Sequence, residues 1–381
     1  MEQVVFPLIP HLATNQWAGA RVATDKLAPV QERVRLCTEN KMLFMKNHYG
    51  LENFRSHKQR KAVLAKLDLL PYVTNRNGKV SLDKKKVKEL KDRHPYFKDH
   101  LQMSHFEATQ SSIEKIFDLV DDEGFIHPKF HQLQAKTGRI TTTRPSPFDK
   151  LLRPIVVPSR PGYGIFEMDV GQAEVWLIAC MSGDLALQRA CDSYDVYLKL
   201  GLDIVPSRFD AGDAKLIMEG PTTPEKKLVL ERLKNIKYHE LRSKLLKPLI
   251  LAILYGQTPQ TVAKNTKQKL SFIQTMFKQL ENAYPDLFQF IQENIKYGSQ
   301  RGYIELRGGF RIHVSGADNE VNRHRNNPIQ GMCAILFNRA LLYAYEAAPR
   351  FEARILFPLY DAIVVEARGH QYASVSYDTS L

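Results

Sequence analysis

The chain of 381 residues is long enough to bury a large core and to divide into two or three domains, and its 44% hydrophobic and 25% charged residues are typical of a globular protein. Its formal net charge of +13 favours a polyanionic partner, either nucleic acid or an anionic membrane surface. No apolar run approaches the roughly 20 residues of a membrane span, no signal peptide is recognisable, and the four cysteines form no C-x-x-C pair. These observations argue against a membrane protein and a zinc site, and they predict a cytoplasmic protein.

Hydrophobic periodicity predicts a chain of helices and strands in the α+β class, with strand segments separated by a helical insertion. Helices are expected over residues 26–70, from Leu82 onward in "LDKKKVKELKDRHPYF", over 186–298, and as one long helix within 317–348. Strands are expected in "GYGIFEMDV" (162–170), as a hairpin in "GYIELRGGFRIHV" (302–314), and as two buried strands in "ARILFPLYDAIVVEA" (353–367) that join at Tyr360 and Asp361.

Carboxylates interrupt the apolar segments where those strands end. Asp169 closes one predicted strand, Gln172 and Glu174 follow it before an apolar helix resumes at Trp176, and Asp361 lies between two strands. Two such carboxylates brought together could hold a pair of divalent cations, the arrangement used in phosphoryl transfer. A lone aspartate at a strand end is more often a turn former, so spacing alone leaves both interpretations open.

Five segments, in order along the chain, extend this pattern. They are "TGRITTTRP" (137–145), "DVGQAEVWLIACMSGD" (169–184), "KPLILAILYG" (247–256), "NNPIQG" (326–331) and "LYDAIVVE" (359–366). Together they resemble the motifs of family A DNA polymerases, the bacterial DNA polymerase I group. The resemblance implies a right-hand polymerase fold with an antiparallel palm sheet, helical fingers and a helical thumb.

The resemblance also implies roles for individual residues. Asp169 and Asp361 would bind two Mg²⁺ ions, or Mn²⁺ in their place, with the Val170 carbonyl as a further ligand. Lys247 would act in catalysis by holding the triphosphate, and Glu174 would exclude a ribose 2′-hydroxyl. The nucleotide-binding set is Gln172, Glu174, Tyr197, Arg242, Lys244, Leu251 and Tyr255. The residues expected to contact primer-template DNA are Arg139, Asn326 and Gln330.

Lys247, Leu251 and Tyr255 are spaced i, i+4, i+8, so they share one face of a helix. An ordinary amphipathic helix would show the same spacing without any nucleotide contact. The family places arginine four residues before its lysine, but that position is Ser243 here, between Arg242 and Lys244.

Pro248 directly follows Lys247, and a proline there disfavours the α conformation of the lysine. We expect a bulge or kink near 244–248 that returns Arg242 to the triphosphate, with Lys244 as the substitute cation if the helix is straight. Other departures from the family pattern are Val170 and Gly171 after the first aspartate, Tyr360 and Ala362 around the second, Tyr197 in place of a histidine, and Leu251 in place of an aromatic ring.

The expected domains are an N-terminal palm segment 1–24, a thumb 25–111, palm 112–185, fingers 186–299 and palm 300–381. The predicted activity is template-directed extension of a primer 3′-hydroxyl with deoxynucleoside triphosphates, in replication or repair. We expect no exonuclease in this chain, so a separate exonuclease or a processivity factor would be partners, in a bacterial or virus-infected cell. The alternatives are a single-subunit RNA polymerase, a DNA-binding protein without catalysis, and a basic nuclease.

Overall fold

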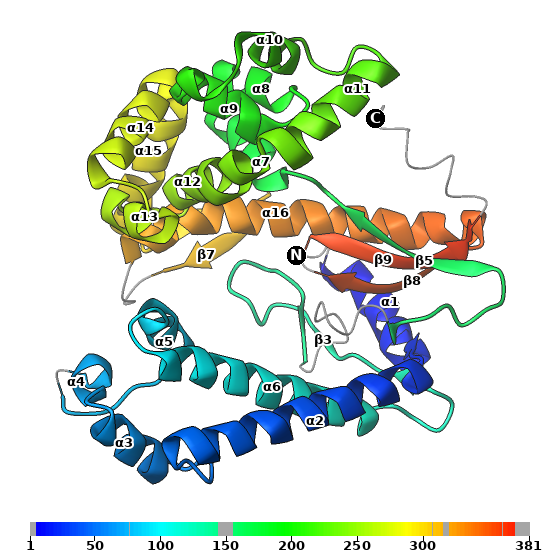
Figure 1. Cartoon of the computed structure of the whole chain (residues 1–381). Coiled ribbons are helices and arrows are strands. Elements are labelled where there is room, and N and C mark those ends of the chain that lie inside the picture. The colour runs from blue at the N-terminus through cyan, green and yellow to red at the C-terminus, as the bar shows by residue number, and fades with distance from the viewer. Residues whose placement is uncertain are drawn as a thin grey trace. The chain divides into compact units, whose positions relative to one another are not determined.

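The computed structural model describes residues 5–75, 77–143, 155–306, 308–314, 320–359 and 361–369, apart from the side chains of Lys85 and Glu320. Tyr360 and the end of the first motif, Arg144 and Pro145, lie outside these residues. Backbone contacts divide the chain into two compact units (Figure 1). Unit 1 comprises Met1–Leu12, Phe130–Thr141 and Glu167–Val365, and unit 2 comprises Ala13–Lys129, Thr142–Phe166 and Glu366–Leu381. The predicted thumb falls within unit 2 and the predicted fingers within unit 1, although the exact domain boundaries stay predictions.

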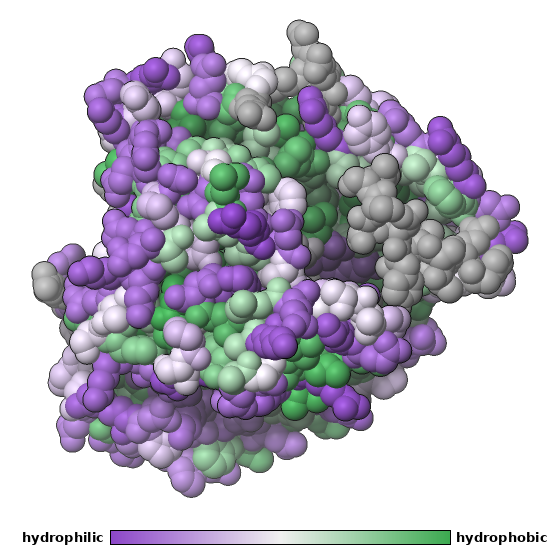
Figure 2. All heavy atoms as spheres, turned by 90° about the horizontal axis from the view of Figure 1, so that it is seen from above, coloured by the Kyte–Doolittle hydropathy of each residue, from purple (hydrophilic) through white to green (hydrophobic). Residues whose placement is uncertain are grey.

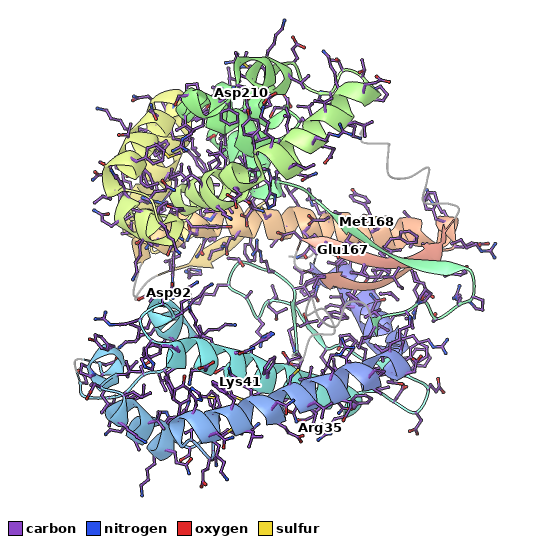
Figure 3. All side chains as sticks on the ribbon, viewed as in Figure 1. Arg35, Lys41, Asp92, Glu167, Met168 and Asp210 are labelled. Carbon is purple, nitrogen blue, oxygen red and sulfur yellow. The ribbon has the colours of Figure 1, made fainter. Side chains whose placement is uncertain are left out.

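Unit 2 is built around two long helices that run side by side, α2 (Thr24–Tyr49) and α6 (Pro95–Phe117) (Figure 1). Lys41 of α2 points toward α6 and pairs with Asp99 at 2.5 Å, where Tyr49 also donates a hydrogen bond at 2.6 Å (Figure 3). Gly50 ends α2 with a φ of 69°, a conformation that glycine adopts without strain. Buried side chains from both helices and the segment between them form one core.

Shorter elements complete this unit. Its other helices are α3 (His57–Lys66), α4 (Leu70–Val73) and α5 (Lys84–Leu90). Strand β1 (Ala20–Arg21) pairs antiparallel with β2 (Phe125–Ile126). Between the helices expected over 26–70 and from Leu82 onward, the chain contains the end of α4 and an isolated bridge between Thr74 and Val80. The chain begins with α1 (Val5–Ala18), and β3 (Phe130–His131) and β4 (Thr141–Thr142) form a further two-stranded sheet.

The predicted fingers are helical, as expected, and share one large hydrophobic core. Their helices are α8 (Leu185–Cys191), α9 (Val196–Ile204), α10 (Ala211–Glu219), α11 (Pro224–Arg232), α12 (Lys247–Leu254), α13 (Pro259–Thr266), α14 (Leu270–Ala283) and α15 (Pro285–Arg301). A 3₁₀ turn covers Pro206–Arg208, and two π-helical segments cover Leu233–Lys237 and Leu241–Leu246. Side chains of Asp184, Asp195, Thr223 and Thr258 accept backbone N–H groups at four of the helix starts, which fixes where those helices begin.

The strands predicted near the C-terminus are confirmed. Strands β8 (Arg354–Leu359) and β9 (Ala362–Arg368) join β5 (Tyr163–Asp169) in a three-stranded sheet of order β5-β9-β8. The predicted hairpin is β6 (Tyr303–Glu305) paired antiparallel with β7 (Arg311–His313). The long helix is α16 (Glu320–Ala347), which contacts β6, β8 and α7 (Ala173–Ser182) and is followed by a 3₁₀ turn at Ala348–Phe351.

On the face seen in Figure 2, hydrophilic side chains predominate among the described residues. Across the described ranges, no helix has the length and apolar character that a bilayer crossing requires.

Candidate active site

The junction between β5 and α7 carries the first group of predicted site residues. Asp169 is exposed at the end of β5, and Val170 after it is also exposed. Gln172 adopts the left-handed conformation, with a φ of 63°, and starts α7. Its side-chain oxygen accepts the backbone N–H of Val196 at 2.8 Å, which ties α7 to the start of α9. This bond gives Gln172 a structural task, and its predicted contact with a nucleotide stays a prediction.

Glu174 is the meeting point of three motifs that are far apart in sequence. The Tyr255 hydroxyl donates a short hydrogen bond to one of its carboxylate oxygens, and Arg139 donates to the other at 3.2 Å. The Glu174 side chain is 19% exposed. Burial and the bond to Glu174 raise the pKa of the Tyr255 phenol, so the hydroxyl keeps its proton and remains a donor.

Arg139 also links Glu174 to the predicted metal-binding aspartate, because its Nη2 lies 3.7 Å from a carboxylate oxygen of Asp361. The residue before it, Gly138, has a φ of 79°, and its carbonyl accepts the side-chain amide of Asn338 at 3.3 Å. Asn338 is buried on α16, two hundred residues along the chain from Gly138. Asn338 is not recognisable from the sequence as a supporting residue, because an asparagine within an apolar helix carries no local signal of a distant partner.

A second group gathers two cations over one aromatic ring. The ring of Tyr197, a buried residue in the first turn of α9, has the Arg242 guanidinium carbon 5.1 Å and the Lys247 ammonium nitrogen 5.7 Å from its centroid. Burial raises the pKa of the Tyr197 phenol to about 12, so this ring is neutral at physiological pH. Arg242 also pairs with the buried carboxylate of Asp195 at 2.7 Å. The arrangement brings two positive charges within 6 Å of the centroid of one ring.

The predicted bulge before the fingers helix is present as the π-helical segment Leu241–Leu246, which ends directly before α12. The extra residue in its turn compensates for the one-residue shift of the arginine. The expectation that Pro248 disfavours the α conformation of Lys247 is wrong, since Lys247 has φ −59° and ψ −48°. Pro248 lies in the first turn of α12, where the missing N–H costs little. Lys244 is exposed and pairs with Glu240.

The C-terminal end of α12 rests against α16. Asn326 donates its side-chain amide to the Tyr255 carbonyl at 3.3 Å, which satisfies a carbonyl that the ending helix leaves open. Gly256 has a φ of 69°, which glycine adopts without strain, and a Cβ atom there would lie 2.6 Å from the Asn322 side-chain oxygen and would displace it. Leu251 packs partly against the fingers core, and Gln330 is half-buried on α16.

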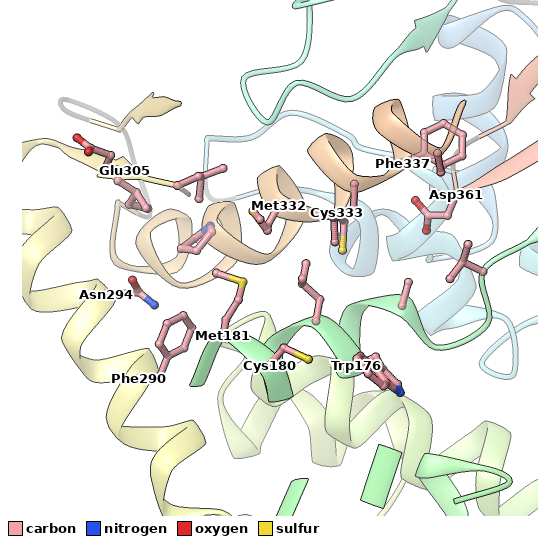
Figure 4. A pocket seen from close by; sticks show the side chains of 18 of the residues that line it. Trp176, Cys180, Met181, Phe290, Asn294, Glu305, Met332, Cys333, Phe337 and Asp361 are labelled. Atoms are coloured by element: carbon pink, nitrogen blue, oxygen red, sulfur yellow. The ribbon is translucent and has the colours of Figure 1, made fainter. Parts of the chain in front are cut away.

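Between α7, α15, α16 and β6, unit 1 contains a mainly apolar cavity of about 830 Å³ (Figure 4). Trp176, Cys333 and Phe337 line it, and Val170 and Asp361 are also among its lining residues. Asp361 lines this cavity directly, and Asp169 directly precedes the lining residue Val170. The described residues contain no group of three or more histidine, cysteine or acidic side chains arranged to hold a metal ion.

Comparison with known proteins gives one consistent family. The family model for DNA polymerase family A matches residues 26–209. The thermostable DNA polymerase I of Thermus aquaticus is 23% identical over 344 residues, which is 85% of this chain and 38% of that protein. DNA polymerase I of Bacillus caldotenax is 24% identical over 392 residues, which is 95% of this chain and 41% of that protein. The chain thus spans less than half the length of these relatives.

Among solved structures, the POL domain of Pol1 from M. smegmatis, in complex with DNA primer-template and dNTP, matches with a TM-score of 0.75 and 19% identity. The match covers 98% of this chain and 65% of that chain. The fold is therefore the right-hand polymerase fold. The family model thus resembles this chain over residues 26–209, and the shared fold extends the likeness to nearly the whole chain.

Proposed function

We propose that this protein is a template-directed DNA polymerase that extends a primer 3′-hydroxyl with deoxynucleoside triphosphates. The observation that carries the proposal is the convergence on Glu174, where Tyr255 of the fingers and Arg139 meet beside Asp361. Three motifs with no proximity in sequence form one polar cluster at the end of the strand that carries Asp169. The formal charge of +13 agrees with a nucleic-acid partner.

The residues present suit divalent cations of the Mg²⁺ type. The Asp169 carboxylate is exposed, the Asp361 side chain is 42% exposed, and the Val170 carbonyl adds a hard oxygen donor of the kind that Mg²⁺ prefers. In the two-ion scheme, Asp169 and Asp361 would hold both ions. When bound, such ions lower the pKa of an attacking hydroxyl and neutralise charge on a leaving pyrophosphate.

The chain's own side chains supply the rest of the proposed mechanism. Arg242 and Lys247 offer two adjacent positive charges for the triphosphate, which binds before the reaction and gains charge during it. Glu174, which accepts hydrogen bonds from Tyr255 and Arg139, limits the space next to the sugar of the nucleotide. Arg139, Asn326 and Gln330 present polar groups to the primer-template, where minor-groove acceptors are common to every base pair.

A primer-extension assay tests the proposal. The full chain is incubated with a primer-template duplex and Mg²⁺, and with either deoxynucleotides or ribonucleotides. We expect extension with deoxynucleotides that follows the template sequence. Extension with ribonucleotides alone would support an RNA polymerase instead, while tight duplex binding without extension would support a DNA-binding protein. Shortening of a mismatched primer would contradict the expected absence of proofreading.

A further inference from the structure

The two oxygens of the Asp195 carboxylate have different partners. Oδ1 accepts the backbone N–H of Leu198 at 3.0 Å and thereby caps the start of α9. Oδ2 accepts a hydrogen bond from Nε of Arg242 at 2.7 Å, and Nη2 of the same guanidinium lies 2.7 Å from this oxygen in an ion pair. The Asp195 side chain is 1% exposed and that of Arg242 is 17% exposed, so solvent weakens this pair little.

Tyr197, two residues further on, completes the support. Its side chain is buried, and both Arg242 and Lys247 make cation–π contacts with its ring. The first turn of α9 therefore fixes the arginine twice, by charge from Asp195 and by the ring of Tyr197. Lys247 follows the π-helical segment that contains Arg242. The geometry of this π-helical segment therefore sets the spacing between the two cations along the chain.

We propose that Asp195 is a positioning residue for triphosphate binding: it holds the shifted Arg242 beside Lys247 so that both cations face the same polyphosphate. This inference rests on the proposed polymerase function. A free arginine side chain has many rotamers, and fixing it in advance lowers the entropy cost of binding the nucleotide. The π-helical turn compensates for the one-residue shift of the backbone, and the anchor holds the Arg242 side chain in the one orientation in which it acts together with Lys247.

Asparagine at this position separates the two tasks of the carboxylate. Asn is as good a helix cap as Asp, so Asp195→Asn keeps an oxygen for the Leu198 N–H. Its amide nitrogen would then face the guanidinium of Arg242. Both groups are hydrogen-bond donors, so the hydrogen bond and the ion pair are lost. A simple charge argument predicts the opposite effect on binding, because removing a carboxylate near a triphosphate site should strengthen anion binding. For Asp195→Asn, the positioning role therefore predicts weaker nucleotide binding, whereas the loss of negative charge alone predicts stronger binding.

The experiment measures single-nucleotide insertion by the full-length parent and by Asp195→Asn at saturating primer-template. We expect the KM for the nucleotide to rise about tenfold, the loss typical of one charge-assisted hydrogen-bonding contact, with the Kd for primer-template unchanged. An unchanged or lowered KM in a variant of parental thermal stability overturns the inference. If the parent itself fails to extend primers, the proposed function has failed. The inference is then tested by calorimetry of tripolyphosphate binding to the parent and to Asp195→Asn. Tenfold weaker binding by the variant supports the inference, and equal binding overturns it.

Asp184→Asn is the matched control. Asp184 is also a buried helix cap in the fingers, but among the described residues its oxygens accept only the backbone N–H groups of Leu187 and Leu287. This variant should lose stability without a change in nucleotide KM. A double-mutant cycle with Arg242→Gln adds the decisive comparison. If Asp195 acts through Arg242, Asp195→Asn has no further effect on KM once the arginine is gone. Additive effects would overturn the inference.

Discussion

The neighbours of Glu174 fix the position of its carboxylate. A glutamate in the first turn of a solvated helix would contribute a few tenths of a kcal/mol through the helix dipole. Here the side chain is mostly buried and held by Tyr255 and Arg139, so its oxygens are fixed in space. A fixed carboxylate can discriminate by exclusion, because a substrate group that collides with it cannot push it aside.

We expect Glu174→Ala to relax discrimination against ribonucleotides by roughly tenfold or more, with a smaller loss in deoxynucleotide insertion. Tyr255→Phe removes one of the two bonds to Glu174 and should relax discrimination in the same direction but less. The measurement is the ratio of kcat/KM for a ribonucleotide and its deoxy counterpart. Glu346→Gln, an exposed carboxylate on α16, is the control. An unchanged ratio in Glu174→Ala would contradict this role for Glu174.

At the scale of elements, periodicity predicts the secondary structure well. The hairpin at 302–314, the two strands within 353–367 and α16 lie where alternation and helical spacing indicate. The π-helical segment follows from one sequence detail, the arginine displaced by a residue relative to the family. Such predictions depend on residues that are close along the chain, where local preferences decide the structure.

The tertiary partners of buried polar side chains cannot be predicted from periodicity. Asp195 is 47 residues from Arg242, and Asn338 is 200 residues from Gly138. A buried aspartate or asparagine looks the same in a sequence whether it caps a helix, binds a cation or holds a turn. The sequence therefore indicates which residues belong to the site through a family resemblance, but it does not indicate which buried polar side chains support them.

The contact between α6 and the segment after α2 predicts a pH dependence in unit 2. His100 of α6 is buried among Phe54 and Tyr96, with ring centroids 4.8 Å and 5.9 Å away. Burial, and secondarily the Arg60 charge, lowers its pKa to about 4. The unfolded chain binds this proton near pH 6.5 and the folded chain does not, so the free energy of unfolding falls as the pH drops from about 6.5 to 4, by at most about 3 kcal/mol.

Urea unfolding of the full chain at pH 7.5 and pH 5, followed by circular dichroism, checks this expectation. The parent should lose more stability between the two pH values than His100→Leu, which has no proton to bind. His100→Leu also removes Nδ1 of the ring, a buried nitrogen that has no hydrogen-bond partner among the described residues and whose burial costs stability in the parent. Equal losses in both proteins would mean that His100 does not set the acid sensitivity.

At the scale of the whole molecule, the excess of positive charge is the property that no single element explains. The 54 lysines and arginines exceed the 41 acidic residues, and Lys41, Arg139 and Arg242 are among those paired inside the described fold. Internal pairing does not change the net excess of 13 positive charges, which favours binding of phosphate groups. Affinity for a primer-template duplex should therefore fall steeply with salt, by about a thousandfold between 50 and 200 mM if six or more phosphates are neutralised.

Fluorescence anisotropy of a labelled duplex over that salt range measures the slope of log Kd against log salt. Lys244→Gln serves as a comparison, because Lys244 already pairs with Glu240 and should change the slope little. A flat response in the parent would leave the net charge of +13 without a nucleic-acid partner.

The most direct test of the polymerase assignment is single-turnover primer extension by Asp361→Asn, with duplex affinity measured on the same preparation. Asparagine keeps the shape of the side chain and removes the charge that a divalent cation needs, while phosphate contacts elsewhere dominate DNA binding. The account predicts that extension in Mg²⁺ falls on the order of a thousandfold or more and that the Kd for primer-template stays within about twofold of the parent value. Extension by Asp361→Asn at the parental rate would contradict the assignment of Asp361 as a metal ligand and, with it, the proposed mechanism.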